Sequence, residues 1–530
     1  MTTAPDPATG TPQPVQDTGT ARARVATLAL LAATVLVHLP AMERYGWFRD
    51  ELYYVSCAKR LAWGYVDQPP LSIALLAAWR AIVGDSLVGM RVIPLVAHLV
   101  TVWLTMGLAR RLGGGAFAQA LAGVGALTSL VYLGASHNYS MNALDIVLWL
   151  LAALALLNAL ERMRLVDWAW LGAAFGAGLL NKLSMLWCAG GLLLGVLVSG
   201  RRRVLATPGP WLAGAIAAVL FAPHVVWQVE NGWPTLEFMR NATAHKMVAA
   251  SLPGFLVGQV LAMNPLAMPI WLAGLVRGLR SRTHAAQGYP GDLGLILALQ
   301  YVAVFALLMV VRTARADYLA PAYPGLLALG GVAFEQATSR PGRRGWRIAA
   351  VALPVASMLT LVPFALPLLP VDTFIRYQAA LGRKPAAEEH HRMGVLQQHY
   401  ADMFGWPEFA DSVARVASTL TPGERDRAIV IVDNYGEAGA LEMFGRGRLP
   451  RIAGQHNTWY LWGPPVWDRS VAIFVGRDSA EVAEECDTVR VAGIAGHPLA
   501  MPYERDMPIV IARHFRPDLA VAWKQGKHYE

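Results

Sequence analysis

Long apolar segments separated by short polar loops dominate the first 370 residues. A helix needs about 20 mostly apolar residues to cross a bilayer, and eleven segments approach that length. They cover about 25–42, 88–109, 117–135, 143–160, 167–181, 183–199, 209–228, 254–276, 293–311, 318–335 and 347–369. A further apolar stretch, 71–83, is too short to span and is expected in the membrane interface. The pattern predicts an α-helical polytopic membrane protein.

The last part of the chain has a different pattern. Its short β-rich runs are Ala428–Val432, Val471–Val475, Val489–Val491 and Pro508–Ala512, and helix-like stretches such as Gly436–Phe444 lie between some of them. Strands that alternate with helices predict a small α/β domain. We therefore expect three parts. They are a disordered cytoplasmic tail at 1–24, a transmembrane domain at 25–370 with a first outer loop at 43–87, and an α/β domain at 371–530.

Basic clusters predict the orientation of the chain. With the N-terminus in the cytoplasm, the strong basic clusters between the segments all fall on the cytoplasmic side, as the positive-inside rule requires. These clusters are Arg110–Arg111, Glu161–Arg164, Arg201–Arg203, Arg277–Arg282 and Arg340–Arg347. An odd number of spans then places the C-terminal domain outside. The chain is thus predicted to be a multi-pass cell-membrane protein with an extracytoplasmic C-terminal domain.

Composition agrees with this class. The chain is 55% hydrophobic and 15% charged, whereas soluble domains are about 25% charged. Its net charge of +9 comes from short clusters between apolar segments, so it indicates membrane orientation and not nucleic-acid binding. Cys57, Cys188 and Cys486 are far apart and match no metal or redox spacing, which argues against a disulfide framework.

Ionisable and amide side chains gather on the predicted outer face. They are Asp50, Glu51, Asp67, Gln68, His137, Asn138, Asp145, Lys182, His224, Arg312 and Arg315. Each has a plain alternative: a solvated loop for the acidic pair, snorkelling for Lys182 or Arg312, and structural hydrogen bonding for the histidines. Together they form an acidic set suited to deprotonating a hydroxyl and a cationic set suited to phosphate. Sugar transfer from a lipid phosphate needs both sets.

Several motifs carry a family resemblance over about 40–335. They are Phe48–Tyr54, Asp67–Leu71, Arg91, Asp145, Leu179–Lys182 and Arg315–Pro321. With these motifs the chain resembles the polytopic glycosyltransferases of the GT-C superfamily, family 39. That family includes the protein O-mannosyltransferases and resembles the lipid A aminoarabinose transferases. The resemblance implies a large first outer loop with surface helices, a catalytic aspartate in it, and a polyprenyl-phosphate-linked sugar donor.

The resemblance also implies roles for individual residues. Asp50 matches the catalytic aspartate, with Glu51 beside it, and Asp145 matches a second acidic position. The donor phosphate is expected to meet a basic set made of Lys182, Arg312 and Arg315, with Tyr318 beside it. Further expected site residues are Asp67, Gln68, Arg91, His137, Asn138 and His224.

Two points qualify the resemblance. Many relatives of the aminoarabinose type have Lys before Pro-Pro, whereas this chain has Gln68, which argues against the same substrate. Some relatives use a divalent metal, and Asp67 with nearby histidines is a candidate ligand set that sequence spacing does not establish.

The predicted function is inverting transfer of a sugar to a lipid, glycan or protein hydroxyl, with Asp50 as general base. A transporter or lipid flippase is the main alternative, because such proteins are also polytopic with polar groups among their helices. A catalytically inactive member with an outer binding module is another. In the C-terminal domain, the aromatic and amide run Gln455–Pro465 fits either a sugar ring or packing against the bundle.

Overall fold

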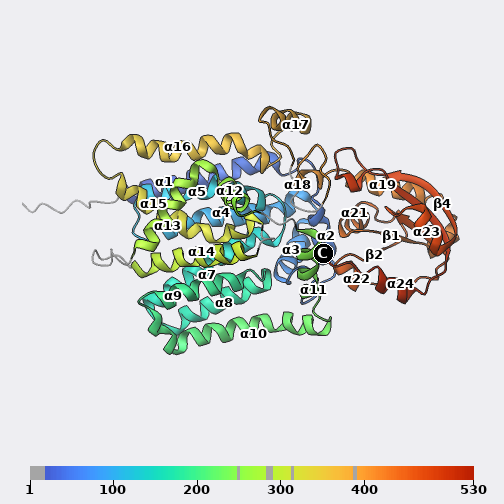
Figure 1. Cartoon of the computed structure of the whole chain (residues 1–530), viewed down its shortest axis with the longest axis horizontal. Helices are drawn as coiled ribbons and strands as arrows, with labels where there is room; N and C mark the ends of the chain where they lie inside the picture. Colours follow the sequence, from blue (N-terminus) through green and yellow to red (C-terminus); the bar gives the residue numbers. More distant parts are fainter. Residues whose placement is uncertain (1–17, 248–250, 282–290, 312–314, 386–390) are drawn as a thin grey trace, which may run out of the picture.

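A computed structural model describes residues 18–247, 251–281, 291–311, 315–385 and 391–530. A bundle of long helices occupies one end of the molecule and a sheet-containing domain the other, with short helices between them (Figure 1). The helices of the bundle are α1 (Thr18–His38), α4 (Leu87–Arg111), α5 (Ala116–Leu127), α6 (Leu130–Ala135), α7 (Met141–Arg162), α8 (Leu165–Asn181), α9 (Met185–Val198), α10 (Pro208–Glu230), α12 (Leu252–Ala262), α13 (Met268–Arg280), α14 (Gly291–Val310), α15 (Tyr323–Ala337) and α16 (Arg344–Leu361). The membrane-protein class and the two-part architecture are confirmed.

The predicted count of eleven crossing helices is not confirmed. By length and composition, six helices of the described chain could cross a membrane, or seven if one bent pair counts as a span. The segment 117–135 is divided between α5 and α6, and 254–276 bends by 87° between α12 and α13. At that bend Asn264 has φ +70°, and Pro265 follows it without a backbone donor. A continuous apolar stretch therefore does not form one straight helix.

Glycines allow the closest helix contact in the bundle. A Cβ atom at Gly274 of α13 would lie 1.9 Å from the Leu326 carbonyl oxygen of α15. A Cβ at Gly330 of α15 would lie 2.0 Å from the Ile270 carbonyl oxygen. Only residues without a side chain allow backbones to approach so closely, as is common between membrane helices.

Three short helices lie between the bundle and the C-terminal domain: α2 (Arg49–Ala58), α3 (Leu71–Val83) and α11 (Pro234–Asn241) (Figure 1). The segment 71–83, predicted to lie in the interface, is α3. Helix α2 is buried along most of its length because it packs against the C-terminal domain on one side and the bundle on the other. The acidic pair Asp50–Glu51 therefore occupies the first turn of a buried helix, not a solvated loop.

The C-terminal domain contains a mixed five-stranded sheet of order β2-β1-β3-β5-β4. Its strands are β1 (Ile429–Val432), β2 (Arg451–Gly454), β3 (Val471–Val475), β4 (Cys486–Ala495) and β5 (Met507–Phe515). Strand β1 is parallel to β2 and β3, whereas β5 is antiparallel to β3 and β4.

Helices pack against this sheet and connect it to the rest of the chain. Its domain and linker helices are α17 (Val371–Ala380), α18 (Gln398–Ala401), α19 (Trp406–Ala417), α20 (Pro422–Arg427), α21 (Tyr435–Phe444), α22 (Thr458–Leu461), α23 (Ser479–Glu485) and α24 (Leu519–Gln525). Helices α19 and α21 share one apolar core with one sheet face and with α2. This shared core joins the domain to the outer loop.

Candidate functional site

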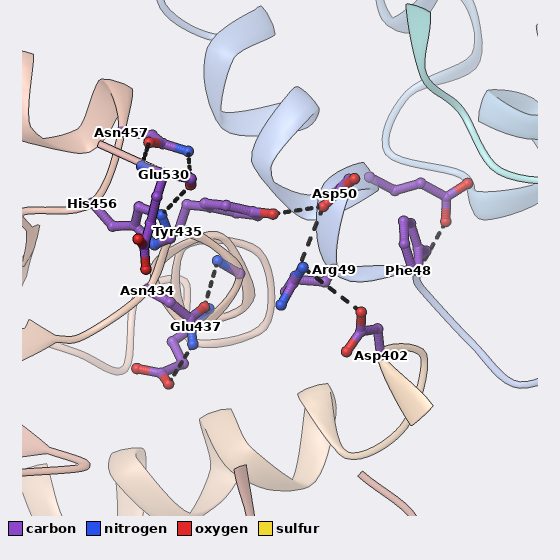
Figure 2. Close-up of polar contacts among 12 residues, drawn as sticks. Phe48, Arg49, Asp50, Asp402, Asn434, Tyr435, Glu437, His456, Asn457 and Glu530 are labelled. Carbon is purple, nitrogen blue, oxygen red and sulfur yellow. Dashed lines mark hydrogen bonds and ion pairs between the residues drawn. The ribbon is translucent and has the colours of Figure 1, made fainter. Parts of the chain in front are cut away.

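Asp50 lies where α2 meets the C-terminal domain. Its side chain is 36% exposed. The Tyr435 hydroxyl donates a hydrogen bond of 2.9 Å to its Oδ1, and Arg49 Nε lies 3.8 Å from the same oxygen (Figure 2). Within the described chain, no hydrogen-bond donor contacts Oδ2. The carboxylate is thus held through one oxygen while the other is available to a ligand.

Asp67 is a second carboxylate in the same outer loop. The Tyr53 hydroxyl donates to its Oδ1 at 2.7 Å, and the Tyr53 oxygen lies 2.6 Å from Thr458 Oγ1 of the C-terminal domain. Burial raises the pKa of Asp67 to about 6; the Tyr53 hydrogen bond opposes this shift and the negative charge of Asp50 adds to it. The two carboxylates are therefore close enough to influence each other electrostatically.

Glu51 has a different environment from its neighbour. Its carboxylate is fully buried and receives two hydrogen bonds from Arg91, at 3.0 Å to Oε1 and 2.9 Å to Oε2. The backbone amides of Tyr139 and Phe48 each donate to it at 3.0 Å. All of its contacts are with the protein interior, and an acceptor hydroxyl cannot reach it. The geometry favours a structural role for Glu51 and Arg91 over the site roles predicted for them.

Lys182 lies between α8 and α9, close to the start of α7. Lys182 Nζ lies 2.7 Å from Asn142 Oδ1, 3.9 Å from Asp145 Oδ2 and 5.5 Å from the centre of the Tyr318 ring. Asp145 is 1% exposed and accepts two contacts from the Ser184 hydroxyl, at 2.8 and 3.0 Å. Asp145 therefore orients Lys182 and is itself too deeply buried to contact an acceptor.

Tyr54 connects the acidic and basic groups. It follows Tyr53 on α2, and its hydroxyl accepts a hydrogen bond of 3.2 Å from the Met141 amide at the start of α7. Asn181 Nδ2 donates to the Met141 carbonyl oxygen at 2.9 Å. The start of α7 thus joins α2, which carries Asp50, to the turn that carries Lys182.

Known glycosyltransferases are similar to this chain. Residues 67–227 match the family described as dolichyl-phosphate-mannose-protein mannosyltransferase. Over most of its length the chain is similar to the crystal structure of ArnT from Cupriavidus metallidurans bound to undecaprenyl phosphate. The TM-score is 0.59 at 16% identity, covering 92% of this chain and 97% of that one. The chain therefore shares the fold of this ArnT structure.

Other known proteins are also similar to the chain. The archaeal oligosaccharyltransferase AglB from Archaeoglobus fulgidus matches with a TM-score of 0.50 at 12% identity, over 81% of this chain and 64% of that one. Undecaprenyl phosphate-alpha-4-amino-4-deoxy-L-arabinose arabinosyl transferase 1 of Pseudomonas fluorescens (strain Pf0-1) is 29% identical over 186 residues. That match covers 31% of this chain and about a third, 32%, of the length of that relative.

The remaining predicted site residues lie in different surroundings. Arg315 forms an ion pair of 3.1 Å with Asp317, just before Tyr318, whereas Arg312 lies outside the described residues. The His224 ring Nδ1 lies 2.9 Å from the Trp63 carbonyl oxygen, and no described contact joins His224 to either carboxylate. Three predicted residues have buried side-chain polar atoms without a hydrogen-bond partner among the described residues; they are Gln68, His137 and Asn138.

The predicted metal ligands do not gather around Asp67. Among the described residues, no group of three or more His, Cys, Asp or Glu side chains is arranged to hold a metal ion. The residues present therefore do not fit a metal site, and no step below is assigned to one.

The groups that touch the Asp50 and Asp67 carboxylates were not predicted from the sequence. Tyr53 lies within the matched motif, but Tyr435 and Thr458 are in the C-terminal domain, beyond the segment that carries the resemblance. Two local signals were present. The run Gln455–Pro465 contains Thr458, and Asn434 in the Asp433–Gly436 turn after β1 caps α21. That turn predicts where a helix begins, but not that its first residue meets Asp50.

Proposed function

We propose that this chain transfers a sugar from a polyprenyl-phosphate donor to an acceptor hydroxyl at the extracytoplasmic membrane surface, with inversion at the anomeric carbon. The observation that carries the proposal is the half-exposed Asp50 carboxylate, held through Oδ1 and free at Oδ2, at the same end of the bundle as Lys182. An oriented carboxylate and an oriented cation are what a hydroxyl acceptor and a phosphate leaving group require.

The proposed reaction is a single displacement. The acceptor hydroxyl binds Asp50 Oδ2, and its oxygen attacks the anomeric carbon while the bond to the phosphate oxygen breaks. The hydroxyl proton passes to Asp50, and the leaving phosphate gains negative charge. Lys182 as a point charge and Arg315 as a forked donor stabilise that charge. One displacement inverts the anomeric carbon, which gives the proposed stereochemistry.

The donor class is supported by the relatives. The P. fluorescens protein is described as acting with undecaprenyl phosphate-linked aminoarabinose, and the C. metallidurans structure holds undecaprenyl phosphate. Both names contain a polyprenyl phosphate, so we propose that class of donor here. The sugar is left open, because Gln68 stands where relatives of the aminoarabinose type commonly have Lys.

The proposed orientation has the N-terminus in the cytoplasm and the C-terminal domain outside. Arg111 and Glu161, at the C-terminal ends of α4 and α7, form an ion pair of 2.6 Å at the end of the bundle that the basic-loop rule assigns to the cytoplasm. Cysteines introduced at Arg202 and at Arg425 should be labelled from opposite sides of the membrane. Labelling from the same side would place the proposed site on the wrong face.

Asp50→Asn tests the catalytic proposal. The amide keeps the shape of the side chain but cannot accept the acceptor proton, so we expect turnover to fall by about 10²–10⁴-fold. Membranes containing the full chain are incubated with labelled polyprenyl-phosphate sugars, and transfer and donor binding are both measured. Asp85→Asn, the same change elsewhere in the outer loop, is the control and should keep wild-type turnover. Normal turnover in Asp50→Asn would overturn the assignment of the base.

A further inference from the structure

Tyr435 connects the C-terminal domain to the proposed base. It is separated from Asp50 by 385 residues, yet its hydroxyl donates to Asp50 Oδ1 at 2.9 Å (Figure 2). Its side chain is only 7% exposed. Its ring packs against Tyr53, with centroids 4.7 Å apart, and against His456, with centroids 4.8 Å apart. The hydroxyl is thus held on a ring that has little freedom to move.

The start of α21 determines where this hydroxyl lies. Asn434 follows β1, and its Oδ1 accepts hydrogen bonds from the amides of Gly436 and Glu437 at 2.8 and 3.0 Å. This cap makes Tyr435 the first residue of the helix. A Cβ at Gly436 would lie 2.3 Å from Arg49 Cγ, so a glycine there lets α2 approach closely. The cap and the glycine together bring the tyrosine against Asp50.

A second contact from the same domain holds the second carboxylate. Thr458 Oγ1 lies 2.6 Å from the Tyr53 oxygen and accepts a hydrogen bond of 3.0 Å from the Val66 amide. Tyr53 in turn donates to Asp67. Asp50 and Asp67 are therefore both held by tyrosines whose rings pack together at the domain interface.

We infer that Tyr435 is a positioning residue for transfer, and that the active site is completed by the C-terminal domain. By donating to Oδ1, Tyr435 restricts rotation of the Asp50 side chain and directs Oδ2 toward the acceptor hydroxyl. Tyr435 itself neither gives up nor takes a proton in the reaction. The inference rests on the proposed function of Asp50 as general base. It gives the C-terminal domain a role in the chemistry.

Tyr435→Phe in the full chain tests the inference. Phenylalanine keeps the ring and its packing and removes only the O–H donor. Loss of one orienting hydrogen bond to a charged group should lower kcat about tenfold and leave the donor KM unchanged. Tyr377→Phe is the matched control, because its hydroxyl donates to the Thr360 carbonyl at 2.6 Å, away from Asp50. It should keep wild-type kcat.

A double-variant comparison separates positioning from a general structural effect. If Tyr435 acts through the base, Tyr435→Phe should cause no further loss in the Asp50→Asn background, since that background has no base to orient. The same tenfold loss in both backgrounds, or a raised donor KM with a lowered unfolding temperature, would show a structural role and overturn the inference.

The outcomes also separate this inference from the proposed function. Wild-type kcat in Tyr435→Phe, with Asp50→Asn inactive, overturns the role of Tyr435 and leaves the base assignment intact. Wild-type kcat in Asp50→Asn overturns the base assignment itself. If Asp50→Asn has no measurable transfer, the kcat and KM values of the single Tyr435→Phe variant decide the question.

Discussion

Glu51→Gln should destabilise the protein without removing its chemistry, although Glu51 is adjacent to the proposed base. The Glu51 and Arg91 side chains are 0% and 1% exposed, and they meet through two hydrogen bonds. In the variant, an amide nitrogen replaces one of the two carboxylate oxygens. Its N–H groups then face two donors, Arg91 and the backbone amide of either Tyr139 or Phe48. The Arg91 charge then lacks its counter-charge, although Met42 and Gly46 carbonyl oxygens still accept from it at 3.0 and 2.7 Å.

The expected magnitude follows from this burial. Removing one partner of a buried ion pair costs about 3–5 kcal/mol, because the remaining charge is neither paired nor hydrated. Glutamine retains one acceptor oxygen, so we expect a loss of unfolding free energy of about 3 kcal/mol, at the lower end of this range. An exposed pair differs strongly: Glu161 is 36% exposed beside Arg111, and such pairs contribute about 0–1 kcal/mol.

The assay compares Glu51→Gln with Glu161→Gln in detergent at one fixed heating rate. Tryptophan fluorescence reports unfolding, and transfer is measured on the folded fraction at a temperature where both variants are folded. We expect a large drop in unfolding temperature for Glu51→Gln, almost none for Glu161→Gln, and substantial turnover in both. Wild-type stability combined with lost turnover in Glu51→Gln would refute this reasoning and would support the catalytic role predicted for Glu51 from the sequence.

Three further predictions concern other parts of the molecule. Arg315→Lys should reduce kcat/KM for the donor about tenfold because it loses the forked contact; wild-type kinetics would limit Arg315 to anchoring in the interface. Burial raises the pKa of Glu437 from 4.5 to about 8. The folded protein therefore keeps this proton to higher pH than the unfolded chain. The contribution of Glu437 to the free energy of unfolding is complete below pH 4.5 and falls between pH 4.5 and 8 by at most about 1.4 kcal/mol per pH unit. Glu437→Gln should make the unfolding temperature vary less with pH between pH 5 and 8. Gly274→Ala should cost about 1–3 kcal/mol by overpacking α13 against α15, whereas Gly190→Ala, which faces open space, should leave the unfolding temperature unchanged.

The class of this protein was predictable because a bilayer requires long apolar segments, and these can be recognised from local sequence. A membrane-spanning backbone must satisfy its own hydrogen bonds, so apolar segments of sufficient length indicate helices without knowledge of their neighbours. The alternation of strands and helices after residue 370 was informative because β-rich runs and helical stretches can also be recognised from local sequence. The number of straight crossing helices was not predictable in this way. The bend at Asn264 depends on its contacts with the Thr128 and Pro354 carbonyl oxygens, which come from distant segments.

The candidate site was also only partly predictable from the sequence. The sequence alone determined that Asp50 and Glu51 are an acidic pair just after the first long apolar segment, and the structure shows that this pair begins α2. Successive side chains on a helix point about 100° apart, so these neighbours face different surroundings. Glu51 meets Arg91 of α4 inside the bundle, while Asp50 meets Tyr435 of the C-terminal domain. Only the tertiary structure decides which carboxylate is buried in an ion pair and which stays open to a substrate, because the partners lie 40 and 385 residues away.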